Sequence, residues 1–334
     1  MPLHDVGYRS WGGTRSVAML RWLTVATTGI QLVWRGTWLR RTIFFTWLPA
    51  IVLASGFLFY EQALTRPNAQ QEVARILGAA ARSGPLAELL KEDIVKARHD
   101  VWATLLMTFF RYPQAFVMVL VVGMIAPRSI SYDLRSKAYL LYFSKPLTLW
   151  EYILGKSMVI WFYLAMITTV PACLMYILGI LLSNDWSVVL ATWDLPIRIL
   201  SASMVLVIPT TALALAFSSA THESRYAAFA WVATWVIGAV SYAVLTAAST
   251  ATSTDPLVRR MGRGRRGEIT PEMAAITERW EFVSPYHMLG RVQEWIFGLS
   301  AEDKSITPYA IAIGLVTLLS LLFMHWQISR RLKG

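Results

Sequence analysis

The residues with the most obvious chemical potential are Gly155, Lys156 and Ser157, which match the end of a phosphate-binding loop. That loop cradles phosphate with free backbone N–H groups of a Gly-x-x-x-x-Gly-Lys-Ser/Thr turn between a strand and a helix. The position five before Gly155 is Trp150 rather than glycine, and an apolar run follows Ser157. The motif is therefore incomplete, and the sequence predicts that any nucleotide hydrolysis, with its ATP and Mg²⁺, belongs to a partner.

The other residue types that could perform chemistry are scattered. The histidines lie at positions 4, 99, 222, 287 and 325, with no two within one helical turn, whereas a metal site needs clustered ligands. Cys173 is the only cysteine, and no Gly-x-Ser-x-Gly nucleophile motif occurs. We therefore predict no catalytic residue, no metal site and no cofactor in this chain, which is not expected to be an enzyme.

Composition indicates the environment in which the chain folds. Hydrophobic residues make up 56% of it and charged residues only 15%, whereas soluble domains carry roughly 45–50% and about 25%. The 15 Trp and 13 Tyr suit the headgroup boundary of a bilayer. A formal charge of +11 is then explained by basic loops against anionic lipid headgroups, and nucleic acid is not expected as a partner.

Six apolar runs are long enough to cross a membrane as helices, which needs about 20 residues each. They are residues 43–60, 101–130, 157–182, 197–218, 226–248 and 309–326. Outside the second run, their central portions contain no Asp, Glu, Lys or Arg. Carriers driven by protons or sodium place ionisable residues there to bind the coupling ion, so the sequence disfavours ion-coupled transport.

The second run allows two placements because it contains Arg111 and Pro113. In one, the span reaches from Arg111 to Pro127, about 24 Å of helix, and Arg111 extends to the headgroups. In the other, residues 101–110 lie along the interface and the span starts at Tyr112. Both placements give the same topology.

The flanking segments complete an all-α integral membrane architecture. Residues 17–38 have the spacing of a basic amphipathic helix in the membrane surface, within a cytoplasmic N-terminus of residues 1–42. Residues 43–326 form the six-helix transmembrane domain, with extracytoplasmic loops at 61–100 and 249–308. The first loop is expected to hold short helices and the second a basic run at 259–267, followed by an amphipathic stretch, 280–299, on or dipping into the membrane.

The orientation rests on where the positive charges lie. Lys and Arg divide equally between the two sides, so the positive-inside rule gives a tie. We place both termini and the 327–334 tail in the cytoplasm of a cell (inner) membrane protein, because Arg40, Arg41, Arg330 and Arg331 crowd the span ends on that side.

The stretch between the second and third runs, residues 128–156, has the most punctuated polar sequence. It opens with alternating acidic and basic residues, continues as a short amphipathic helix, and breaks at Lys145 and Pro146 before a second helix enters the third run. Two ordered pieces in a short polar segment favour a surface that receives a partner. An ordinary interfacial loop explains them equally well.

Here the chain resembles the permease subunits of ABC-2 type transporters. The matching positions are Asp133, Leu140, Leu141, Ser144, Pro146, Leu147, Thr148, Glu151, Leu154, Gly155 and Lys156. The Gly-Thr pair usual after the acidic residue is replaced by Ser136 and Lys137. The six-run layout, the amphipathic N-terminal helix and a polar excursion before the last run are similar too.

The resemblance implies that residues 128–156 carry the coupling helices, seated in a groove of a separate ATPase subunit. Rim contacts would be Asp133, Arg135, Lys137 and Lys145. The buried anchor would come from Tyr139, Tyr142 and Phe143. The segment's other motif positions are Pro146, Glu151, Gly155 and Lys156.

The resemblance also implies the partners. A second cytoplasmic contact would be His222, Glu223 and Arg225 between the fourth and fifth runs, where a tight helical hairpin is an equal explanation. Two ATPase copies would serve a pair of permeases, formed with a second copy or a paralogue, and export is the usual direction. Apolar spans suggest a lipid-like cargo, and the outer loops leave room for an extracytoplasmic protein. The alternative is a polytopic membrane scaffold or enzyme that acts without an ATPase.

Overall fold

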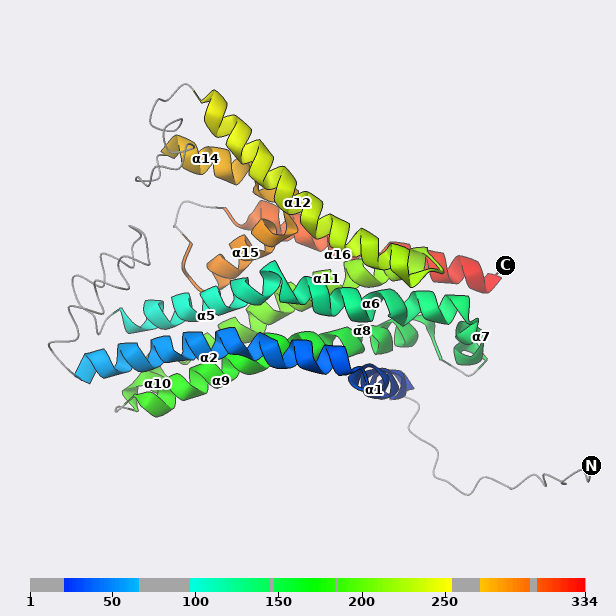
Figure 1. Ribbon diagram of the computed structural model, residues 1–334, viewed down its shortest axis with the longest axis horizontal. Coiled ribbons are helices and arrows are strands. Elements are labelled where there is room, and N and C mark those ends of the chain that lie inside the picture. The colour runs from blue at the N-terminus through cyan, green and yellow to red at the C-terminus, as the bar shows by residue number, and fades with distance from the viewer. Residues whose placement is uncertain are drawn as a thin grey trace, which may run out of the picture.

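The computed structural model describes residues 21–65, 97–144, 147–183, 186–253, 271–300 and 305–333, and all regular elements within these ranges are helices. In chain order they are α1 (Arg21–Trp34), α2 (Thr37–Thr65), α5 (Arg98–Ala115), α6 (Val117–Arg135), α7 (Ala138–Phe143), α8 (Leu149–Ile167), α9 (Thr169–Leu182), α10 (Ser187–Ala191), α11 (Leu195–Ala220), α12 (Ser224–Thr252), α14 (Pro271–Trp280), the 3₁₀ turn η2 (Glu281–Val283), α15 (Pro285–Ile296) and α16 (Thr307–Lys333). The long helices lie along one axis, with α7 and the end of α16 at one end of the bundle and α10 at the other (Figure 1).

Six helical segments are long and apolar enough to span a membrane, which confirms the all-α membrane prediction. They are Thr37–Gln62, Val117–Arg135, Leu149–Leu182, Leu195–Ala220, Ser224–Thr252 and Thr307–Leu332. The third combines α8 and α9, which meet at the non-helical Thr168. Pro171 follows, and because it has no N–H, the carbonyl of Ile167 loses its helical partner there.

The second span differs from both predicted placements. Phe116 departs from helical geometry, with φ −141° and ψ −51°, so α5 ends before the span α6 begins. The interfacial placement of residues 101–110 is wrong, because Trp102, Leu106 and Phe110 are fully buried and α5 packs on α2, α9 and α15. Arg111 precedes the span and points into the protein, so it does not extend to the headgroups as the other placement requires.

Two clusters of buried side chains hold the bundle together. One joins α6, α8, α11 and α12 with the end of α16. The other lies toward α10 and centres on Trp102, which contacts Phe57 edge-on at a ring distance of 5.3 Å. A side chain at Gly179 would come within 2.9 Å of both rings, so this glycine lets α9 approach α2 and α5 closely.

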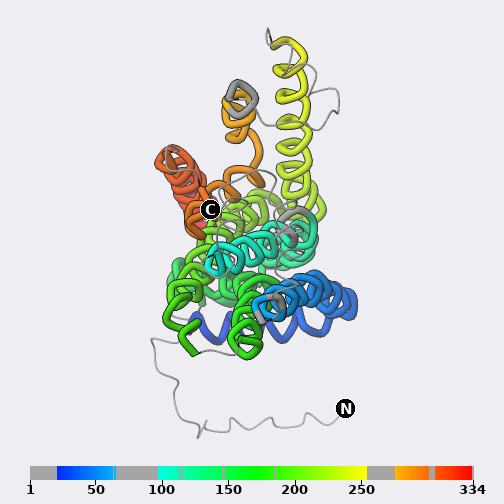
Figure 2. Tube along the Cα trace, turned by 90° about the vertical axis from the view of Figure 1, so that its left-hand side faces the viewer, coloured from blue at the N-terminus to red at the C-terminus, as the bar shows by residue number. Residues whose placement is uncertain are grey.

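The segment before the last span re-enters the bundle. The far half of α12 and α14 stand apart from the other spans (Figure 2), and α15 then turns back beside α11, α12 and α16. Gly238, near the middle of α12, touches the start of α15, where an added Cβ would lie 2.8 Å from Pro285. The predicted amphipathic stretch 280–299 therefore packs one face against the bundle, while Trp295 stays 53% exposed.

The predicted short helices after the first span and the basic run at 259–267 lie outside the described residues. Lys145 and Pro146 also lie outside them.

Candidate coupling site

The coupling segment begins where α6 turns into α7. Lys137 adopts a left-handed conformation with φ 56° and ψ 20°, which reverses the chain after a single intervening residue, Ser136. The turn brings the six-residue helix α7 back against the core beneath α6 and α8. Lys137 itself is exposed.

The start of α8 is fixed by a reciprocal hydrogen-bonded cap. The backbone N–H of Thr148 donates to Glu151 Oε2 over 2.7 Å, and the Glu151 N–H donates to Thr148 Oγ1 over 3.3 Å. Such capping boxes satisfy backbone donors that the first helical turn leaves free. Glu151 therefore helps to begin α8 at a defined residue.

A buried ion pair joins the end of α6 to α8. Lys156 Nζ lies 2.7 Å from Asp133 Oδ2, and the Tyr152 hydroxyl donates to the same oxygen over 2.7 Å. The Asp133 side chain is only 9% exposed and that of Lys156 only 14%. Asp133 differs from the expectation of a rim contact, because its charge is paired with that of Lys156 inside the protein. Removing one partner of such a pair leaves a buried charge and typically costs about 3–5 kcal/mol.

Gly155 makes room for the N-terminal helix α1. An added Cβ there would lie 2.8 Å from Val25 Cβ and 2.9 Å from the Trp22 carbonyl oxygen. A Cβ at Gly29 of α1 would in turn lie 2.5 Å from Val159 Cγ2 of α8. The two glycines let the backbones of α1 and α8 approach closely, so α8 covers one face of α1.

The aromatic residues of α7 face inward. The rings of Tyr142 and Phe143 lie 5.5 Å and 5.6 Å from the ring of Tyr152, and Tyr139 packs on the same core. Burial raises the pKa of Tyr142, and the nearby carboxylate of Asp133 adds to the shift. These three side chains thus fix α7 to the helix bundle, whereas the prediction had them anchoring a partner.

The outward face of α7 is aliphatic instead. Leu140 is 52% exposed and Leu141 is 73% exposed. Arg135 and Lys137 lie exposed beside them. An apolar centre with a basic rim is therefore present, but its apolar part is made by the two leucines.

The predicted second contact lies next to the first. Glu223, before α12, is 3.6 Å from Arg135 at the end of α6 and 3.9 Å from Arg225. His222 is exposed beside them. These exposed pairs contribute little stability, but their geometry joins the two predicted contacts into one surface.

The comparison with protein families decides the class of this protein. Residues 36–326, most of the chain, match the family model described as "ABC-2 family transporter protein". The chain belongs to this family. It is therefore the membrane component of a transport system. The comparison with curated proteins found no match.

In this ABC-2 family member, sequence reasoning missed the residues that tie α6 to α11. The Ser218 hydroxyl accepts the N–H groups of Ile130 and Ser131, each over 3.1 Å, and donates to the carbonyl of Pro127. Ser131 Oγ donates to the Ser218 carbonyl over 2.7 Å. Ser131 lies just beyond the second apolar run and Ser218 ends the fourth, and nothing in the sequence indicates that these two serines meet. The predictions of no metal and no cofactor stay predictions.

Proposed function

We propose that this chain is the permease subunit of an ATP-driven exporter and that a separate ATPase binds the exposed face of α7. The observation that carries the proposal is the division of α7 into two faces. One face is fixed on the core by aromatic contacts, while Leu140 and Leu141 stay uncovered. Fully desolvated apolar anchors within a polar rim are typical of binding hot spots.

The internal ties of the segment support a mechanical role. Asp133 on α6 holds Lys156 and Tyr152 on α8, and α7 packs on the same residues. A displacement of α7 is therefore passed to two spans as one rigid body, which is how small interface shifts become domain motion. The ATPases would supply that displacement when they bind and hydrolyse ATP with Mg²⁺.

The assembly follows from the same account. Two ATPase copies serve two permeases, either two copies of this chain or one with a paralogue, since closed two-fold pairing is the commonest arrangement. The termini lie in the cytoplasm of a cell (inner) membrane, on the side of α7. A hollow of about 360 Å³ between α11, α12 and the start of α15 is mainly apolar, with Phe217, Ile237 and Pro285 among its lining. Its apolar lining supports a lipid-like or amphipathic cargo, and outward transport is the direction that the family resemblance implies.

Copurification tests the proposal. The wild type should retain an ATPase encoded by a neighbouring gene, and Leu141→Gln should lose most of it. Leu190→Gln is the matched control, because Leu190 is 79% exposed at the opposite end of the bundle. Equal retention by both variants would place the contact elsewhere. If no ATPase is recovered with the wild type, a scaffold or enzyme acting alone becomes the better explanation.

A further inference from the structure

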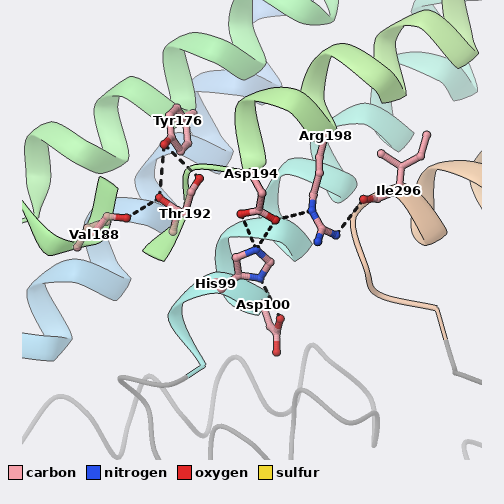
Figure 3. A network of polar contacts seen from close by, with 8 residues as sticks. All are labelled: His99, Asp100, Tyr176, Val188, Thr192, Asp194, Arg198 and Ile296. Atoms are coloured by element: carbon pink, nitrogen blue, oxygen red, sulfur yellow. Dashed lines mark hydrogen bonds and ion pairs between the residues drawn. The ribbon is translucent and has the colours of Figure 1, made fainter. Parts of the chain in front are cut away.

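A second polar network joins the start of α5, the start of α11 and the end of α15 (Figure 3). The start of α5 lies near α10, at the end of the bundle opposite α7 (Figure 1). His99 on α5 stands between two carboxylates. Its Nδ1 lies 3.3 Å from Asp100 Oδ1, and its Nε2 lies 3.1 Å and 3.0 Å from the two oxygens of Asp194. Only the doubly protonated imidazolium has a proton to donate from each nitrogen.

The network continues from Asp194 to the end of α15. Arg198 Nε donates to Asp194 Oδ2 over 2.6 Å, and Arg198 Nη1 donates to the carbonyl of Ile296 over 2.9 Å. Gly298 follows with φ 74°, and an added Cβ there would lie 2.6 Å from Arg198 Nη1. Asp194 thus orients the arginine that caps the last turn of α15.

The charges around His99 come from three elements of the described structure. On its own helix they are Asp100 and Arg98, and from α11 they are Asp194 and Arg198. From α2, Glu61 pairs with Arg98 at 3.1 Å. The hydrogen bond to Asp100, followed by the contacts with Asp194, raises the pKa of His99 above its ordinary value despite partial burial. Hydrogen bonding to His99 lowers the pKa of Asp194 against the opposing effect of burial.

We infer that His99 is a proton-operated latch. When protonated, it holds Asp194 in place, Asp194 orients Arg198, and Arg198 secures the end of α15. When His99 loses its proton, only one ring nitrogen can still donate, so one carboxylate faces a lone pair and the contact with Asp194 is no longer charge-assisted. Asp194 is then held less firmly, and the C-terminal turn of α15 loosens. The latch does not depend on the ATPase. Which compartment it senses rests on the proposed orientation, in which His99 lies on the outer side of the membrane.

The direction of the pH effect follows from the raised pKa of His99. Its contribution is fully present below the pKa of an unfolded histidine and is lost as pH rises through the raised folded value. The lowered pKa of Asp194 keeps its carboxylate ionised throughout that window. The latch is therefore closed in mildly acidic and open in alkaline surroundings.

Hydrogen–deuterium exchange of α15 in lipid nanodiscs tests the latch. Wild type and His99→Gln are compared at the same pH, so intrinsic exchange cancels, at about pH 5 and about pH 9, which bracket histidine titration. At the lower pH the variant should exchange about tenfold faster than the wild type in residues 290–299, the effect of one charge-assisted hydrogen bond. At the higher pH the two should agree. His222→Gln, exposed at the other end of the bundle, should match the wild type at both.

Equal exchange at the lower pH would overturn the latch. A difference that persists unchanged at the higher pH would also overturn it, because a purely structural role of His99 does not depend on its proton. Asp100→Asn gives a second test should His99→Gln fold poorly. The Asp100 side chain is 36% exposed, and its hydrogen bond makes the largest contribution to the raised pKa of His99, so this variant should loosen α15 at a lower pH than the wild type does. An unchanged transition contradicts the assignment.

Discussion

The two ends of the bundle use the same kind of contact for different purposes. At the coupling end, Asp133 holds Lys156 with side chains 9% and 14% exposed. At the other end, Asp194 holds His99 with side chains 27% and 29% exposed. Lysine stays charged across physiological pH when its charge is paired, whereas histidine changes charge close to neutrality. Burial and the choice of cation thus make the Asp133–Lys156 pair a constant structural contact and the Asp194–His99 pair a contact that depends on pH.

The largest effect is expected from breaking the buried pair. Asp133→Asn leaves Lys156 largely buried without its carboxylate, and should lower the free energy of unfolding by about 3–5 kcal/mol. The double variant Asp133→Asn with Lys156→Gln removes both charges and should recover part of the loss. Unfolding titrations in mixed micelles measure these free energies. If Asp133→Asn alone lost as little stability as the loss of an exposed pair, the structural role of the buried pair would be contradicted.

The next effect concerns the contact between α1 and α8. Gly155→Ala places a methyl group 2.8 Å from Val25 Cβ and 2.9 Å from a backbone oxygen, and should cost about 1–3 kcal/mol as α1 moves away. Gly314→Ala is the matched control, because nothing lies within 4 Å of its new methyl group. The same unfolding titration compares them. A loss of stability in both variants would assign the effect to glycine flexibility instead of to packing.

A smaller, pH-dependent effect is expected at the opposite end. Asp194→Asn replaces the charged acceptor of both His99 and Arg198 by a neutral amide with a single acceptor oxygen, and should destabilise by about 1–2 kcal/mol in mildly acidic buffer. Above the raised pKa of His99 the loss should shrink, because the wild type no longer gains from the imidazolium. Melting temperatures of wild type and variant across pH test this. A constant difference between them would contradict the contrast between the two ends.

The smallest effect is expected for the exposed ion pairs between the end of α6 and the start of α12. Glu223→Gln removes the partner of Arg135 and Arg225, whose side chains are 66% and 74% exposed, and should change stability by about 0–1 kcal/mol. Any effect on ATPase binding in the same variant would then reflect the surface itself. A stability loss comparable to that of Asp133→Asn would show that exposure does not determine how much an ion pair contributes to stability in this protein.

The spans could be predicted from the sequence because each is a continuous apolar run. The second predicted span was the one misplaced, and Arg111 and Pro113 interrupt its run. The role of Arg111 was not readable. Its guanidinium lies over Gly290 and donates to the Tyr286 carbonyl, a contact between positions far apart in the chain. A long-range pairing depends on how helices pack, and one sequence carries no direct record of that.

The coupling segment shows the same limit within a motif. Its position and the break between α7 and α8 were predictable, because the polar residues and the Lys145-Pro146 break are local features of the sequence. Which face of α7 points outward was not, because the aromatic face and the aliphatic face of this six-residue helix are both apolar. The core decided it by taking Tyr142 and Phe143 and leaving Leu140 and Leu141 outside. Asp133 was predicted to be an exposed rim contact because its pairing with Lys156 joins two helices and leaves no local signal in the sequence.

The most direct test of the account is photocrosslinking in intact cells. A photoreactive amino acid at position 141 should form a crosslink to an ATPase subunit, while the same residue at position 190 should not. The crosslinked partner is identified by mass spectrometry of its peptides. An ATPase crosslinked from position 141 alone supports docking on α7. Crosslinks from position 141 to lipid only, in cells that contain the ATPase, would contradict the central claim.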